Sequence, residues 1–66
     1  MIWLAVDKDG SEWVFSGKPI RDESIDTWCP SNVWGDTCIE LPKDSIYKLT
    51  GKILTWDDEP IELKIT

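Results

Sequence analysis

The sequence contains no histidine. Histidine is the commonest general base near neutral pH, the usual partner of Ser and Cys nucleophiles, and a frequent zinc ligand. Its absence excludes these forms of catalysis, and two cysteines cannot complete a zinc site within one chain. We therefore expect no bound metal, no cofactor and no enzymatic activity.

Carboxylates are the catalytic groups that remain. The densest run is Asp57-Asp58-Glu59, directly before Pro60. A Mg²⁺-dependent hydrolase needs two or three carboxylates that converge on one point, whereas consecutive turn residues mostly point apart. The four glycines are isolated from one another, so there is no glycine-rich phosphate loop. A carboxylate-based metal-dependent hydrolase is accordingly our third functional hypothesis.

Positive charge is scarce as well. Seven Lys and Arg face thirteen Asp and Glu, a formal net charge of −6. Because this charge repels phosphate backbones, it excludes general nucleic-acid binding. It suits a protein that presents an acidic face to a basic partner.

Long apolar runs are also missing. The run Ile2–Val6 is too short to cross a membrane and lacks the basic flank of a signal peptide. We expect a cytoplasmic protein with no membrane partner. Cys29 and Cys38 would normally be reduced there, but their spacing could also close a disulfide loop, and both alternatives stay open.

Tryptophan, by contrast, is abundant: a single expected domain of residues 1–66 holds five, beside one Phe and one Tyr. Each indole buries a large area and offers one N–H donor. A domain this small is near the lower limit for folding without a staple or a partner, so we expect a homo-oligomer. The tryptophans are Trp3, Trp13, Trp28, Trp34 and Trp56.

An N-terminal hairpin is the clearest structural prediction. The β-rich runs 2–6 and 12–15 flank a turn from Asp7 to Gly10. A two-residue turn would pair Val6 with Trp13, whereas a type I turn with a Gly10 bulge would pair Ala5 with Trp13. We favour the bulge, because Asp at the first turn position and Gly at the last match type I chemistry.

The remaining pattern predicts an α+β fold: a small antiparallel sheet made of this hairpin and two or three further strands, with one short helix around residues 42–50. Pro42 would start the helix, Ile46 and Leu49 would supply an apolar pair at i,i+3 spacing, and Gly51 would end it. Three further extended segments are expected. Residues 37–41 would direct Ile39 and Leu41 inward, and residues 61–65 would direct Ile61, Leu63 and Ile65 inward. The third segment is residues 53–56.

Residues 22–37 are interpreted as a long irregular loop with room for one helical turn. Loops this long in small domains are usually functional. Trp28 and Trp34 lie in this loop, with Arg21 and Lys18 just upstream. Indole and guanidinium planes stack on flat ligands, so these four residues are the predicted ligand-binding site, while Trp3, Trp13 and Trp56 are assigned to the core.

A resemblance adds a biological context. The strings LAVDKDGSEW (4–13), GKPIR (17–21), LPKDSIYKLTG (41–51) and LTWDDEP (54–60) resemble short accessory proteins encoded by phages of gut bacteria. The resemblance carries no established function and no site residues. Phage genomes hold many compact, non-enzymatic proteins that inhibit host defences, so the context it adds is a counter-defence role. Our first functional hypothesis is therefore a non-enzymatic binding protein that sequesters a small nucleotide-like ligand. The second is an acidic inhibitor of a basic, nucleic-acid-binding host protein.

Overall fold

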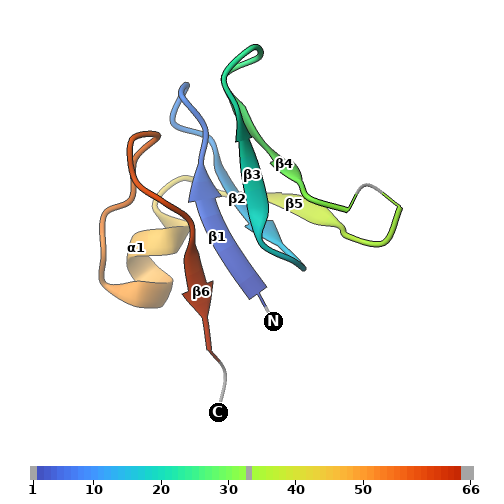
Figure 1. Ribbon diagram of the computed structural model, residues 1–66. Helices are drawn as coiled ribbons and strands as arrows, with labels where there is room; N and C mark the ends of the chain where they lie inside the picture. The colour runs from blue at the N-terminus through green and yellow to red at the C-terminus, as the bar shows by residue number, and fades with distance from the viewer. Residues whose placement is uncertain (1, 33, 65–66) are drawn as a thin grey trace.

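The structure is a computed structural model that describes residues 2–32 and 34–64. Within them the chain forms a four-stranded antiparallel sheet, a separate two-stranded sheet and one short helix (Figure 1). The predicted α+β fold is confirmed. The elements in chain order are β1 (Ile2–Val6), β2 (Glu12–Phe15), β3 (Pro19–Asp22), β4 (Thr27–Pro30), β5 (Cys38–Leu41), α1 (Ser45–Thr50) and β6 (Ile61–Leu63).

The N-terminal hairpin of β1 and β2 has the bulged register. Ala5 lies opposite Trp13, and Trp3 lies opposite Phe15. The N–H of Gly10 donates to the carbonyl of Asp7, the first residue of the turn, at 2.9 Å. Gly10 has a φ of +92°, in the left-handed region that favours glycine. The predicted bulged register is therefore confirmed.

The hairpin forms the centre of the larger sheet, whose strand order is β5-β2-β1-β6. Its aliphatic face is covered by α1, where Leu4, Val6 and Ile46 form a buried cluster. The strands predicted near residues 37–41 and 61–65 are the two edges, β5 and β6. The expected inward position of Ile65 lies outside the described residues.

The helix is shorter than predicted and begins at Ser45, not at Pro42. The carboxylate of Glu12 on β2 satisfies its first turn, accepting the N–H of Asp44 at 2.5 Å and the N–H of Ile46 at 2.8 Å. Gly51 ends the helix in the left-handed conformation, as expected. Of the predicted apolar pair, Ile46 is buried whereas Leu49 is 56% exposed.

The predicted irregular loop at residues 22–37 is wrong in its first half. The segment from Pro19 to Pro30 is a second hairpin, in which Arg21 on β3 lies opposite Trp28 on β4. Its turn contains no glycine. The Asp22 side chain closes this turn by accepting the Ser24 N–H at 3.0 Å. Asp26, with a φ of +57°, adopts the left-handed conformation that reverses the chain.

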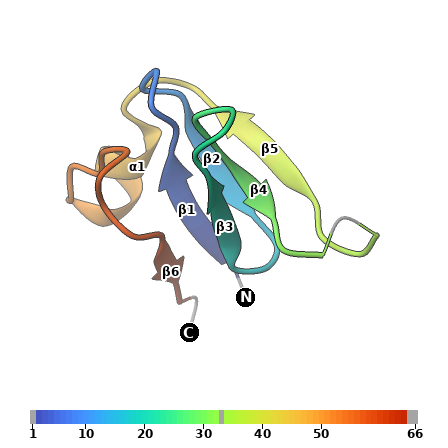
Figure 2. The same cartoon turned by 45° about the horizontal axis from the view of Figure 1, so that its top comes forward.

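This second hairpin covers the aromatic face of the sheet. Figure 2 shows β3 and β4 in front of β1 and β2. Ala5, Phe15 and Trp28 form the buried cluster between the two layers, and Trp3, Trp13 and Trp56 pack around it half-buried. The three tryptophans assigned to the core thus belong to its margin.

Two smaller predictions also differ from the structure. Ile39 on β5 is predicted to face inward but is 64% exposed. Leu41 of the same strand packs against the cluster beneath α1, and Ile39 does not. Residues 53–56 form no strand, and Ile53 is 79% exposed.

Cys29 and Cys38 are free thiols. Among the described residues, no helix has the length and apolar character needed to cross a membrane.

Candidate functional site: an acidic end formed by three turns

Three turns lie together at one end of the molecule, at the top of Figure 1. They are the β1–β2 turn, the β3–β4 turn and the turn that precedes β6. Direct contacts join the first two: the Lys8 N–H donates to the Asp26 carbonyl at 3.3 Å, and their side chains form an ion pair at 3.9 Å. The third is a β-turn in which the Asp58 N–H donates to the Thr55 carbonyl at 3.1 Å and the Asp58 carboxylate accepts the Thr55 N–H at 2.8 Å.

This end carries the entire net charge of the protein. It holds eight carboxylates and two cations, a formal charge of −6, and the rest of the chain has five groups of each sign. All eight carboxylates except Asp7 are exposed or half-exposed. We call this region the acidic end; it comprises Asp7, Lys8, Asp9, Arg21, Asp22, Glu23, Asp26, Asp57, Asp58 and Glu59.

Arg21 ties the third turn to the second hairpin. Its guanidinium carbon lies 4.7 Å from the Trp28 ring centroid and 5.0 Å from that of Trp56. Its Nη2 donates to the Trp56 carbonyl at 2.7 Å and to the Asp58 carbonyl at 3.3 Å, and lies 3.7 Å from Glu59. Arg21 and Trp28 are therefore brought together as predicted, but each is engaged by other parts of this chain.

Trp28 anchors the second hairpin to β1. Its side chain is only 7% exposed, and its indole Nε1–H donates to the Val6 carbonyl at 2.9 Å. Its backbone N–H donates to the Asp7 carboxylate at 2.8 Å. A ring held on both sides in this way contributes to folding, and its predicted part in ligand stacking stays a prediction.

Asp7 is the buried acid of this end, with 6% of its surface exposed. Burial raises the pKa of its carboxyl group, because the charged form loses hydration, and the hydrogen bond from the Trp28 N–H only partly offsets this. At the surface, Ser11 lowers the pKa of Asp9 and Ser24 lowers the pKa of Asp22 by donating hydrogen bonds. The carboxylates of Asp9 and Asp22 therefore keep their negative charge under mildly acidic conditions.

An open cleft of about 420 Å³ lies between the first and third turns. Leu54 and Trp56 contribute apolar walls, and Asp57 contributes a carboxylate. A lysine or arginine side chain packs its aliphatic part on apolar surface, and its charged group pairs with a carboxylate or lies over an aromatic ring. The cleft matches both requirements. Its lining residues are Val6, Asp7, Lys8, Gly10, Glu12, Leu54, Thr55, Trp56 and Asp57.

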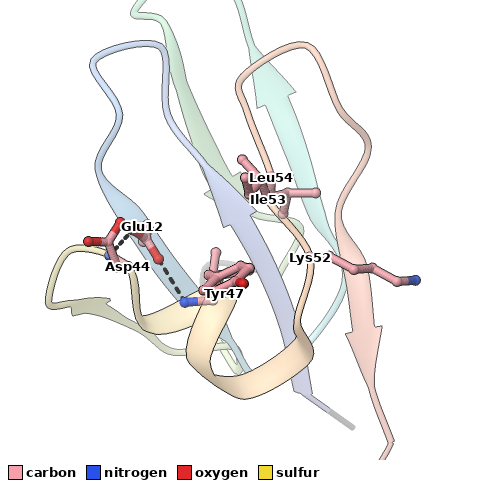
Figure 3. Close-up of a pocket in the computed structure, with 7 residues that line it drawn as sticks. Glu12, Asp44, Tyr47, Lys52, Ile53 and Leu54 are labelled. Carbon is pink, nitrogen blue, oxygen red and sulfur yellow. Dashed lines mark hydrogen bonds between the residues drawn. The ribbon is translucent and has the colours of Figure 1, made fainter.

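A second cavity of about 260 Å³ shares Glu12 and Leu54 with this cleft. Figure 3 shows the Glu12 carboxylate bonded to the start of α1, Tyr47 beside it, and the Lys52 side chain extending away. Because its carboxylate already accepts two backbone N–H groups, Glu12 has less capacity for an outside ligand than Asp57.

The other predicted site residues lie elsewhere. Trp34 is 96% exposed, and its backbone N–H donates to the Asn32 side chain at 3.2 Å. Lys18 lies over the ring of Trp3, with Nζ 5.6 Å from the centroid. Lys18, Arg21, Trp28 and Trp34 thus occupy three settings. Four cavities formed by residues 2–32 and 34–64 are lined by other side chains.

Sequence reasoning indicated an acidic face from the net charge but did not locate it in these three turns. The available signal was the placement of acids at chain reversals, but their assembly at one end depends on the β3–β4 hairpin, which was not predicted. Within the described residues, no group of three Cys, Asp or Glu side chains is arranged to hold a metal ion.

Comparison with known proteins finds no match: no protein-family model, curated protein or solved structure is similar to the chain. The resemblance to phage accessory proteins, the nucleotide-like ligand and the homo-oligomer therefore stay predictions.

Proposed function

We propose that this chain is a non-enzymatic protein-binding module whose acidic end occupies a basic surface on another protein. The observation that carries the proposal is the segregation of charge, since three turns hold the whole formal charge of −6. A concentrated field of one sign speeds encounter with the opposite charge and disfavours partners of like charge. The acidic end repels phosphate groups and attracts surfaces rich in Lys and Arg.

The cleft between the first and third turns supports specific contact as well as long-range attraction. Exposed ion pairs alone contribute little, about 0.2–1 kcal/mol each. A cationic side chain seated between Trp56 and Asp57 would add an aromatic contact and partial removal from water, which strengthen the interaction. The contacts of Arg21 and Lys8 hold the three turns together before binding, which reduces the entropy lost on association.

Basic surfaces of this kind are typical of nucleic-acid-binding proteins. A module that covers such a surface competes with nucleic acid for it. We therefore place the protein among acidic inhibitors, and the phage context implied by the sequence resemblance would make the partner a host protein.

A charge-matched pair of variants tests the proposal. The first removes three charges from the acidic end, with Glu23→Gln, Asp57→Asn and Glu59→Gln. The second removes three from the remainder, with Asp36→Asn, Glu40→Gln and Asp44→Asn. Both have a formal charge of −3, so they differ only in where the charge lies. Binding to a fluorescent arginine-rich peptide is measured by anisotropy at low and high salt.

We expect the first variant to weaken binding about ten-fold, because three lost ion pairs contribute about 0.2–1 kcal/mol each. The second should stay close to the wild type, and high salt should weaken the wild type most. The wild type should also displace a labelled oligonucleotide from the peptide. Equal weakening in both variants would refute the proposal, since net charge alone would then explain binding.

A further inference from the structure

Strand β5 leaves one edge of the larger sheet open. It pairs with β2 on one side, and no strand of the described residues pairs with its other side. In Figure 2 it is the outermost strand. Three of its four residues, Cys38, Ile39 and Glu40, are exposed. Unpaired edges are commonly protected by lysine or proline, and β5 contains neither.

An uncovered apolar surface adjoins this edge. Ile39 is 64% exposed on the aliphatic face, beyond the part that α1 covers. Beside it is a shallow cavity of about 260 Å³ with almost wholly apolar walls. Its lining residues are Ile2, Val14, Phe15, Ser16, Thr37 and Ile39.

We infer that β5 is the interface with a second copy of this chain, joined antiparallel about a two-fold axis into one continuous sheet. An axis perpendicular to the sheet makes the interface isologous and keeps the two aliphatic faces on the same side. Opposed residues then share a face, so the centre of the pair is either Ile39 or Glu40 of both copies.

The chemistry of the edge selects the first register. With Ile39 opposite Ile39 of the second copy, two exposed aliphatic side chains cover each other and Glu40 faces Cys38. With Glu40 opposite Glu40, two like charges would meet directly, which is destabilising. The Ile39 register also places Thr37 opposite Leu41 of the second copy, so apolar surface is added next to the cavity.

The distribution of charge favours this arrangement of two copies. A chain with a charge of −6 normally repels its own kind, but that charge lies in the acidic end. Antiparallel pairing of β5 sends the acidic ends of the two copies in opposite directions. The surfaces that meet come from the remainder of the chain, whose formal charge is zero. Both acidic ends stay free, so self-association is independent of the proposed basic partner.

Light scattering on a size-exclusion column tests the inference with two matched variants. Ile39→Lys places a charge at the centre of the edge, and Ile25→Lys places it on the β3–β4 turn, where the isoleucine is similarly exposed at 60%. We expect the wild type and Ile25→Lys to have twice the chain mass of 7.6 kDa. Ile39→Lys should have the single-chain mass and an unchanged circular dichroism spectrum.

A cross-linking experiment keeps the test decisive even if Ile39→Lys does not fold. In a background with Cys29→Ser and Cys38→Ser, Ile39→Cys or Ile25→Cys supplies the only thiol. Under mild oxidation, position 39 should form a covalent dimer much faster than position 25. A single-chain mass for the wild type across a dilution series, a dimer that survives Ile39→Lys, or equal cross-linking at the two positions would overturn the inference.

Discussion

The backbone N–H of Trp28 donates to the buried carboxylate of Asp7 at 2.8 Å. This bond joins the end of the central strand to the hairpin that covers the aromatic face. It is one of the few polar links between the two sheets, and it depends on an acid whose pKa is raised by burial. We therefore expect the docking of the second hairpin to depend on pH.

Replacement of Asp7 by asparagine tests that dependence. A raised pKa in the folded state means that the protonated carboxyl stabilises the fold, and that this contribution is lost as pH rises through the folded pKa. Asparagine keeps an oxygen acceptor for Trp28 and has no charge. We expect Asp7→Asn to gain stability over the wild type as pH rises from about 4 towards 7.

Thermal unfolding across this pH range measures the difference between the two proteins. Asp7→Ala is the control, because it removes the acceptor and leaves the Trp28 N–H unpaired at a cost of about 1–3 kcal/mol. A constant difference between wild type and Asp7→Asn at every pH would contradict the account.

Arg21 contributes through the planarity of its guanidinium. Lysine retains the charge, but it has no planar guanidinium to pack against the rings of Trp28 and Trp56, which themselves meet edge to face. It also cannot keep the same hydrogen bonds. We expect Arg21→Lys to lower the free energy of unfolding by about 1–3 kcal/mol. Urea denaturation measures this, with the exposed Lys18→Gln as control and an expected change below about 0.5 kcal/mol. Equal losses of unfolding free energy in Arg21→Lys and Lys18→Gln would show that the guanidinium contacts contribute no more than an exposed cation.

Trp28 and Trp34, both predicted from the sequence to bind a ligand, should contribute differently to the stability of the fold. Trp28→Phe loses the bond to the Val6 carbonyl and part of the buried ring, so we expect a loss of about 1–3 kcal/mol. Trp34→Phe changes a side chain that is 96% exposed and should cost less than about 0.5 kcal/mol. Denaturation of both variants by urea checks the contrast, and similar losses would place Trp34 in the fold as well.

Glu12 links the sheet to the helix. Because both of its carboxylate oxygens accept backbone N–H groups of the first helical turn, Glu12→Gln removes one acceptor and the charge. We expect faster amide exchange in α1 and a loss of about 1 kcal/mol. Asp44→Asn is the control, since the Asp44 side chain makes no capping bond. Unchanged exchange in Glu12→Gln would show that the helix does not depend on this contact.

Local turn chemistry made the first hairpin predictable. Asp7 and Gly10 select one turn type, and that turn sets which residues share a face. The second hairpin was missed because its turn uses no glycine and its strands contain Arg21, Trp28 and two prolines, an unusual composition for a sheet. Arg21 also contacts Trp56, 35 residues further along the chain, and local sequence does not reveal a contact of that range.

The exposure of Ile39 shows a similar limit. Alternation identifies which side of a strand is apolar, but not how far a short helix reaches across that side. The acidic end shows the same limit of prediction. The sequence gives the charge of each turn, but the assembly of the three turns depends on tertiary contacts. The candidate site was therefore the least predictable part of the molecule.

Chemical-shift mapping is the most direct measurement of the central claim. A uniformly ¹⁵N-labelled sample is titrated with the arginine-rich peptide, and backbone amide shifts are followed residue by residue. We predict that the largest changes fall in the three turns of the acidic end and at Trp56, and fade at high salt. The largest changes at Trp34, β5 or α1, with the three turns unaffected, would contradict the account.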